Sequence, residues 1–222
     1  MVNSDMKCGE RQKNVIFLGT ANAKYHPMEG IDIRLSELLG EMNVIATEDT
    51  GVLNPLQLNE CALFILYREF DLPPLSDSET AALLCYVAAG GSLLVLHNGI
   101  SVQERSELCG LIGAAFTGHP PYEDLPRIMY HVEKPSHPIF TEVSDFTLYD
   151  EAYQFEMDSF ADIELLLSYD FEEKKVPAAW LRKYGKGRMV YICCGHNKEC
   201  FYNKQFSRIL TNAATWLSEG EE

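Results

Sequence analysis

The stretch Gly90-Gly-Ser-Leu-Leu-Val-Leu-His-Asn-Gly99 is the most informative part of the sequence for the fold. Its apolar run at residues 93–96 is short and uninterrupted, which is typical of a strand buried on both faces of a parallel sheet. We therefore predict a strand over residues 92–97, with His97 at its carboxyl end. A strand that leads into a turn and a helix is the unit that forms ligand sites in α/β folds.

The segments on either side of this run carry signals for helix starts. Ser76 and Glu79 have the spacing of a capping box, in which the two side chains satisfy free main-chain amides, and the glycine pair at 90–91 ends the predicted helix. Ser101 and Glu104 have the same spacing. We expect Ser101 to cap a helix that continues through Ile112, rather than to act as a nucleophile.

Similar apolar runs predict the other strands, at residues 14–19, 43–47, 62–67, 127–132, 163–169, 176–184 and 188–193, the last two forming a hairpin. Apolar residues at helical spacing predict helices near 35–42 and 206–217. This alternation indicates a doubly wound, mostly parallel α/β sheet, in which residues 15–19, 63–67 and 93–96 lie adjacent or nearly so. Residues 113–146 are rich in proline, histidine and glycine, so we expect long loops that cover the site.

Length and composition set the class of protein. With 222 residues, of which 46% are hydrophobic, the chain can form one sizeable core, and we expect a single domain over residues 14–218 behind a flexible tail at residues 1–13. No apolar run is long enough to cross a membrane, and residues 1–12 lack the apolar segment of a signal peptide. A cytoplasmic location is the expectation.

Charge and cysteine content narrow the choice of partners. A net charge of −15 argues against nucleic acids and anionic membranes, because both attract basic surfaces, and favours a neutral small molecule. The seven cysteines are an odd number without a CxxC pair, which indicates a reducing compartment. Cys61 and Cys85 lie within apolar runs, so we expect both to be buried free thiols.

The carboxyl ends of parallel strands meet at one edge of the sheet, and unusual side chains follow several of the predicted strands. We expect a functional site there, built from His26, Arg68, His97, Glu151, Tyr153 and His196. Histidine titrates near neutral pH and a carboxylate can orient its ring, so His97, His196 and Glu151 are the predicted proton-transfer residues. The other three are the predicted contacts to substrate.

Alternatives remain open for these residues. No cofactor is predicted, although two histidines and Glu151 could instead hold a divalent metal with open positions for substrate. A zinc site formed by Cys194, His196 and Cys200 would lack a fourth ligand. Each histidine could also be a packed side chain bonded to a main-chain carbonyl, and Asp150-Glu151 a solvated acidic pair. His119, His131 and His137 are assigned no role.

Five motifs resemble those of the trehalose-utilisation (ThuA-like) family, in the expected order and across nearly the whole chain. They are residues 90–99, His137-Pro-Ile139, Asp150-Glu-Ala-Tyr153, Pro177-Ala-Ala-Trp180 and Tyr184-Gly-Lys-Gly-Arg-Met-Val-Tyr-Ile-Cys-Cys-Gly-His196. The resemblance implies a flavodoxin-like fold of the class I glutamine amidotransferase type. It also implies a role linked to carbohydrates, with a carbohydrate-like small molecule as ligand.

The same resemblance places His97 where amidotransferases carry their nucleophilic cysteine, on an elbow similar to Val95-Leu-His-Asn-Gly99. His196-Asn-Lys-Glu199 is similar to the histidine end of their triad. Transfer through an acyl-thioester is then excluded, because no thiol occupies the elbow. The glycine that normally stands two residues before the nucleophile is also absent, so the sequence does not predict the strained elbow geometry.

Three functions are compatible with these observations. The first is an enzyme that acts on a sugar, keto-sugar or disaccharide by histidine and glutamate acid-base chemistry. The second is a non-catalytic module that binds or senses a sugar metabolite, and the third is a structural subunit, with self-association left open. Fold alone does not choose between them. Convergence of the histidines on Glu151 around a pocket would favour the first.

Overall fold

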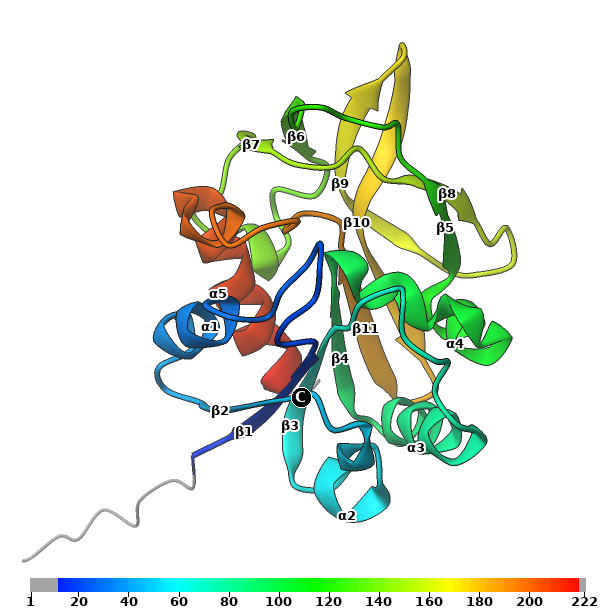
Figure 1. Ribbon diagram of the computed structural model, residues 1–222. Helices are drawn as coiled ribbons and strands as arrows, with labels where there is room; N and C mark the ends of the chain where they lie inside the picture. Colours follow the sequence, from blue (N-terminus) through cyan, green and yellow to red (C-terminus); the bar gives the residue numbers. More distant parts are fainter. Residues whose placement is uncertain (1–11, 220–222) are drawn as a thin grey trace, which may run out of the picture.

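The computed structural model describes residues 12–219 (Figure 1). Within this range the chain forms one nine-stranded sheet in the order β2-β1-β3-β4-β11-β10-β9-β6-β7 and a two-stranded sheet of β5 and β8. The strands are β1 Asn14–Gly19, β2 Asn43–Thr47, β3 Cys61–Tyr67, β4 Ser92–Leu96, β5 Ala114–Gly118, β6 Arg127–Val132, β7 Phe146–Tyr149, β8 Gln154–Met157, β9 Glu164–Phe171, β10 Lys174–Tyr184 and β11 Gly187–Ile192. Apart from residues 12 and 13, the predicted tail lies outside the described residues.

The large sheet has a parallel half and an antiparallel half. Strands β2, β1, β3, β4 and β11 pair in parallel, which confirms that residues 15–19, 63–67 and 93–96 lie in neighbouring strands. From β11 outward, β10, β9, β6 and β7 pair antiparallel. The sheet is therefore mixed, so the expectation of a mostly parallel sheet holds for one half, and the predicted antiparallel hairpin is part of a larger antiparallel half. Tight turns join β9 to β10 and β10 to β11, and such turns can connect only antiparallel strands.

Helices cover both faces of the parallel half (Figure 1). Helices α1 (Ile31–Leu38) and α5 (Lys204–Ser218) pack on one face, and α3 (Asp77–Ala88) and α4 (Ser106–Ile112) on the other. Shorter elements are α2 (Pro55–Leu58), η1 (Thr50–Val52), η2 (His97–Glu104), η3 (Pro138–Phe140) and η4 (Cys200–Tyr202). Every residue of β4 and β11 is buried, as a strand between two helical layers requires.

The two predicted capping boxes have different outcomes. At the start of α3, the Ser76 hydroxyl accepts from the Glu79 amide and the Glu79 side chain accepts from the Ser76 amide, which confirms the first box. The second prediction was wrong, because the Ser101 hydroxyl donates instead to the main-chain oxygen of Arg68, at 2.8 Å. Helix α4 begins at Ser106 without a side-chain cap.

Other differences lie outside the parallel half. Strands β5, β7 and β8 and helix α2 were not predicted. Within residues 113–146, loops connect β5, the predicted strand β6 and η3. Cys85 is exposed and Cys61 half-buried, so the expectation of two buried thiols was also wrong. No helix among residues 12–219 is long and apolar enough to cross a bilayer.

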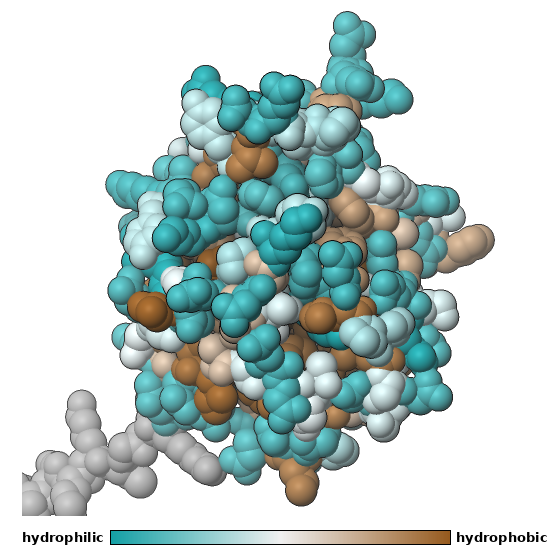
Figure 2. Space-filling view, viewed as in Figure 1, coloured by the Kyte–Doolittle hydropathy of each residue, from teal (hydrophilic) through white to brown (hydrophobic). Residues whose placement is uncertain are grey.

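The surface carries its apolar residues in separate places. The face in Figure 2 is mostly hydrophilic, with small apolar patches between polar side chains. Large exposed apolar side chains come from well-separated segments, among them Ile33, Leu56 and Phe160. Isolated apolar residues of this kind are normal on protein surfaces, and they do not mark a partner-binding face.

Candidate functional site

His97 lies at the elbow between β4 and η2, and its backbone adopts a φ of +42°. Few residues other than glycine adopt a positive φ, and such strained positions cluster at functional sites. The elbow geometry is therefore present without the usual preceding glycine. Gly99 allows this close turn, since a Cβ there would lie 2.3 Å from the main-chain oxygen of Leu66.

Glu151 is the centre on which the predicted histidines converge. Its Oε2 atom lies 3.2 Å from His97 Nε2, 3.2 Å from His196 Nδ1 and 3.4 Å from His26 Nε2. These residues follow β1, β4 and β11, while Glu151 comes from the segment between β7 and β8. Burial opposes ionisation of Glu151, but the three rings that face its carboxylate outweigh this effect and hold its pKa far below the usual range.

A second carboxylate supports His26 from behind. Glu69, two residues after β3, lies 2.9 Å from His26 Nδ1 and also accepts from the His26 amide at 3.1 Å. Burial lowers the pKa of His26, but the hydrogen bonds with Glu151 and Glu69 outweigh it and raise the pKa above its ordinary value. Burial also opposes ionisation of Glu69, but the contact with His26 outweighs this effect. The pKa of Glu69 is therefore lowered.

Asp150 fixes the loop that carries His196. Its carboxylate accepts from the amides of Gly195, at 3.0 Å, and His196, at 3.2 Å, and Asp150 is fully buried. The Tyr67 hydroxyl donates to the main-chain oxygen of Gly195 at 2.7 Å. Gly195 has a φ of +122°, which suits glycine. Together these contacts orient the loop after β11 toward Glu151.

Aromatic rings form the outer wall of the cluster. Tyr153 stacks on His97 with ring centres 4.3 Å apart, and His119 lies nearly parallel to both Tyr153 and Tyr122. His119 Nε2 is 3.5 Å from Oε1, the second oxygen of Glu151. Exposed fractions of the side chains are 0% for His97, 17% for His196 and 32% for His119. Solvent therefore reaches the cluster on its His196 and His119 side.

Five of the six predicted site residues lie together. His26, His97, Glu151 and His196 form the cluster, and Tyr153 packs on it. Arg68 differs, because its guanidinium donates to the main-chain oxygen of Pro73 and its charged neighbours are Glu79 and Glu104.

Two further residues of the site were not predicted. Glu69 follows the same strand as Arg68, so the strand-end rule could have found it. His119 follows the short strand β5, for which the sequence carries no strand signal.

Four residues could hold a metal ion. His26, His97, Glu151 and His196 each offer one ligand atom, and these atoms all lie within 4.8 Å of one another. The alternative set with Cys194 and Cys200 is less suited, because burial raises the pKa of both thiols and metals bind the thiolate.

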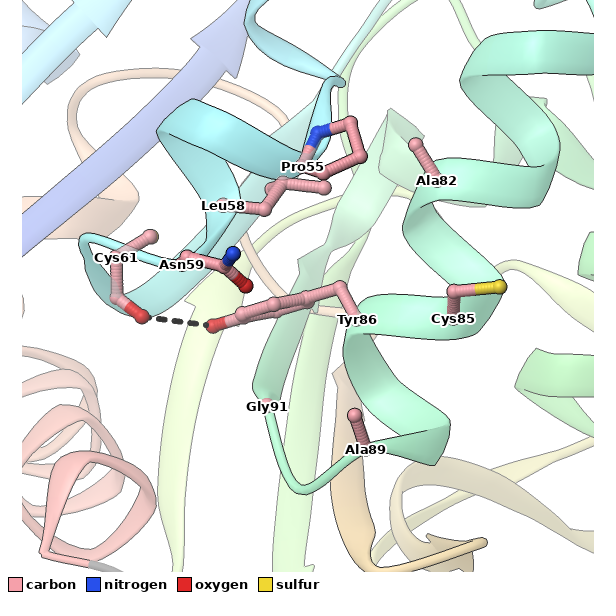
Figure 3. A pocket seen from close by; sticks show the side chains of 9 residues that line it. All are labelled: Pro55, Leu58, Asn59, Cys61, Ala82, Cys85, Tyr86, Ala89 and Gly91. Atoms are coloured by element: carbon pink, nitrogen blue, oxygen red, sulfur yellow. Dashed lines mark hydrogen bonds between the residues drawn. The ribbon is translucent and has the colours of Figure 1, made fainter.

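Several hollows lie outside the cluster on the part of the chain that the structure describes, and two of them bear on the argument. One, of about 390 Å³, is formed between α2, α3 and the starts of β3 and β4 (Figure 3). It includes Cys61, Cys85 and Tyr86, whose hydroxyl donates to the Cys61 oxygen, and it lies at the end of the strands opposite to the cluster. The other, of about 270 Å³, is lined in part by Tyr122 and Ala152, beside Glu151. The second is the better placed for a ligand of the cluster.

Comparison with known proteins identifies the family and the fold. The family model described as trehalose utilisation, ThuA, matches residues 14–217. No curated protein matches the chain significantly in sequence. A ThuA-like protein from Bacteroides uniformis superposes with a TM-score of 0.70 at 18% identity, covering 92% of this chain and 91% of that one.

Two further solved structures share the fold. A ThuA-like protein from Parabacteroides merdae has a TM-score of 0.73 at 13% identity, over 94% of this chain and 90% of that one. A β-galactosidase from Rahnella sp. R3 matches with a TM-score of 0.66 at 13% identity, over 93% of this chain but only 31% of that one. At these identities the likenesses show the fold alone. The family match spans almost the entire described chain, and the protein belongs to the ThuA, or trehalose-utilisation, family.

Proposed function

We propose that the chain is an enzyme that acts on a sugar, keto-sugar or disaccharide by acid-base chemistry at the cluster around Glu151. The observation that carries this proposal is the convergence of three histidines, from three distant segments, on one carboxylate oxygen. Imidazole groups exchange protons near neutral pH, and an ionised carboxylate at this distance can orient their rings. The family match supports carbohydrate as the substrate class.

Exposure divides the roles within the cluster. His196 and His119 reach solvent, so they are the groups that can exchange a proton with a bound molecule. His97 and His26 are buried and hold Glu151 in place. The hollow beside Tyr122 and Ala152 is the proposed place of the sugar, because His119 connects it to Glu151 through direct ring and ion-pair contacts.

We also propose the finer class of the fold, flavodoxin-like and of the class I glutamine amidotransferase type. The order β2-β1-β3-β4-β11 in the parallel half corresponds to the flavodoxin order of strands, and His97 occupies an elbow with positive φ. Amidotransferase chemistry itself is not proposed. The elbow carries an imidazole, and burial raises the pKa of the neighbouring Cys193 thiol well above its ordinary value.

One observation favours a second candidate, a module that binds a sugar without converting it. Tyr153 covers the His97 ring, so a bound molecule cannot touch this ring in the present conformation. In this case the cluster would only shape and charge the pocket. Binding of a sugar without turnover would distinguish this candidate from the enzyme.

The test is a screen of keto-sugars and disaccharides for turnover by the purified chain and by Glu151→Gln. We expect the substitution to lower turnover by about 100-fold or more, because it removes the carboxylate on which the proton-transfer groups converge. The matched control is Glu142→Gln, at an exposed carboxylate whose partner is Arg208 and whose replacement should leave turnover unchanged. Equal turnover by the wild type and Glu151→Gln would refute the proposed site.

A further inference from the structure

We propose that His26, His97, Glu151 and His196 bind one divalent transition-metal ion of the zinc class. The ligand atoms are one ring nitrogen from each histidine and Oε2 of Glu151, the oxygen that faces all three rings. This inference uses the same cluster as the proposed function, but it requires no reaction. The ligands come from four separate segments, which explains why no compact ligand spacing is visible in the sequence.

Hydrogen bonds behind two of the rings determine where their hydrogens lie. His97 Nδ1 is 2.6 Å from the main-chain oxygen of Cys193, and a carbonyl can only accept. His26 Nδ1 faces the carboxylate of Glu69 at 2.9 Å. Both Nδ1 atoms therefore carry the hydrogen. In the neutral rings the lone pair is then on Nε2, and both Nε2 atoms face Glu151.

Such an arrangement is unfavourable without a cation. Two nitrogen lone pairs and an ionised carboxylate would face one another at 3.2 and 3.4 Å. A metal ion at the common point would accept electron pairs from both nitrogens and the oxygen, so it removes the conflict.

The third ring adds an independent observation. His196 Nδ1 is buried and has no hydrogen-bond partner with acceptable geometry, although it lies 3.2 Å from Glu151 Oε2. Buried polar atoms without a partner are rare, and each calls for an explanation such as an ion. A ligand bond to the same metal would satisfy this nitrogen as well.

The donor types agree with the zinc class, and so do the distances from the carboxylate oxygen to the three nitrogens. The four ligand atoms together lie within 4.8 Å of one another, which is wider than a bound ion requires, so the rings would draw closer together on binding. Bonds of 2.0 to 2.1 Å in a tetrahedral site place neighbouring ligand atoms about 3.3 Å apart. The separations of Glu151 Oε2 from the three nitrogens are 3.2, 3.2 and 3.4 Å. Three imidazoles and one carboxylate suit transition metals, whereas calcium and magnesium prefer oxygen ligands. Glu69 behind His26 and the Cys193 carbonyl behind His97 are the outer partners that metal-bound histidines usually have.

An ion at this point would change the division of roles in the proposed reaction. The four ligands would be committed to the metal, and His119, 3.5 Å from the other oxygen of Glu151 and 32% exposed, would be the histidine left free to exchange protons. The ion would be reached from the same side, past His196. The metal site and the proton-transfer group would thus be adjacent but separate.

The experiment titrates chelator-treated full-length protein with Zn²⁺ and, in parallel, with Co²⁺, whose visible absorption reports its ligand geometry. We expect about one ion per chain and a rise in melting temperature on binding. His26→Gln and Glu151→Gln should weaken binding by about 100-fold or more, and Glu69→Gln by about 10 to 100-fold, as for other outer partners. Circular dichroism and melting curves in chelator show which variants are folded.

Two control variants make the result specific. His131→Gln changes a histidine that also faces carboxylates, Asp145 and Asp170, but lies outside the cluster, so it should leave Zn²⁺ affinity unchanged. Cys200→Ala should also leave the affinity unchanged. Loss of binding in Cys200→Ala with binding intact in His26→Gln would overturn the inference in favour of a cysteine site.

Other outcomes separate this inference from the proposed function. Less than about a tenth of an ion per folded wild-type chain, or equal affinity in folded His26→Gln and Glu151→Gln, would overturn the metal site. Turnover of a sugar by protein that takes up no ion in the Zn²⁺ titration would overturn the metal site alone. One ion per chain, lost in the ligand variants, with no turnover of any sugar would support the metal site and leave the proposed reaction refuted.

Discussion

The Nδ1 atom of His97 lies 2.6 Å from the main-chain oxygen of Cys193, so the ends of β4 and β11 are joined through an imidazole ring. These two strands pair in parallel up to Ile192 and Leu96, immediately before the two residues. The main chain of one strand therefore orients a ring on the next, and the ring's other nitrogen faces Glu151. Side-chain substitutions at position 193 cannot remove this carbonyl, which makes the orientation of His97 a property of the fold.

Two glycine substitutions, one at the elbow and one in α4, should have opposite effects on stability. Gly99→Ala should destabilise the protein by at least about 1 to 3 kcal/mol, because the new Cβ would lie 2.3 Å from the oxygen of Leu66 in a buried position. Gly110→Ala in α4 meets no atom within 4 Å and should stabilise the protein by up to about 1 kcal/mol. Urea unfolding of both variants measures the difference, and an unaffected Gly99→Ala would contradict the close contact between η2 and β3.

The sequence predicted the parallel half of the fold well, and the physical reason is burial on both faces. Strands β1, β3 and β4 are continuous apolar runs because helices cover both of their sides. The antiparallel strands carry a weaker signal. Strand β6 alternates between buried and exposed residues, and β7 and β8 have only four residues each.

Ser76 and Ser101 show that sequence spacing alone does not identify a helix cap. Both have a glutamate three residues later, yet only Ser76 caps a helix. The Ser101 hydroxyl bonds to the chain just after β3, a tertiary contact that no local spacing reveals. Ser76→Ala should therefore cost about 1 kcal/mol through loss of the cap, a value that urea unfolding can check. An equally stable Ser76→Ala variant would contradict the capping box.

Convergence of the site was predictable for residues that directly follow strands, since parallel strands end at one edge. His26, His97 and His196 were found in this way. Arg68 obeys the same rule, but its long side chain turns toward the Pro73 carbonyl, which only the packed structure shows. His119 lies beyond a strand that pairs only with β8, and its position depends on that small sheet.

The pair formed by Glu69 and His26 should stabilise the folded protein by an amount that depends on pH. The pKa of His26 is raised on folding, so its charged form stabilises the folded protein. This contribution to the free energy of unfolding is fully present below the unfolded-state pKa of about 6.5 and is lost as pH rises through the folded-state pKa. The pKa of Glu69 is lowered on folding, so its ionised form stabilises the folded protein. This contribution to the free energy of unfolding is present above the unfolded-state pKa of about 4.5 and is lost as pH falls through the folded-state pKa. The charged pair therefore contributes most near pH 6.

Glu69→Gln should accordingly lower the melting temperature more at pH 6 than at pH 9, measured in chelator so that no ion competes for His26. The main-chain hydrogen bonds that Glu69 accepts from His26 and Phe70 are affected at both pH values, so they do not produce the difference. Glu142→Gln is the control, because its exposed partner Arg208 stays charged at both pH values. Equal losses at pH 6 and pH 9 would show that the pair is not charged.

Alkylation should leave the site intact. Among the cysteines that the structure describes, Cys85 is the exposed one, and it lies in the hollow at the far end of the strands (Figure 3). Cys193 and Cys194 are buried and their pKa values are raised by burial, so they remain unreactive thiols. Mass spectrometry of iodoacetamide-treated protein should find Cys85 modified first, with turnover retained. Loss of turnover in folded protein that follows labelling of Cys193 would argue against this.

His97→Gln and His196→Gln should separate structural support from proton transfer. His97 is fully buried with contacts at both ring nitrogens, so its replacement leaves buried groups unpaired. His97→Gln should lower the free energy of unfolding by about 1 to 3 kcal/mol and should also lower turnover.

His196 is partly exposed and its Nδ1 has no hydrogen bond, so its replacement should change stability little. Its loss should still lower turnover by about 100-fold or more, because His196 belongs to the proposed proton-transfer cluster. Melting curves in chelator and initial rates on the substrate found in the sugar screen measure both effects. A His196→Gln variant with unchanged rates would remove the ring from the reaction, and a His97→Gln variant as stable as the wild type would contradict its two buried contacts.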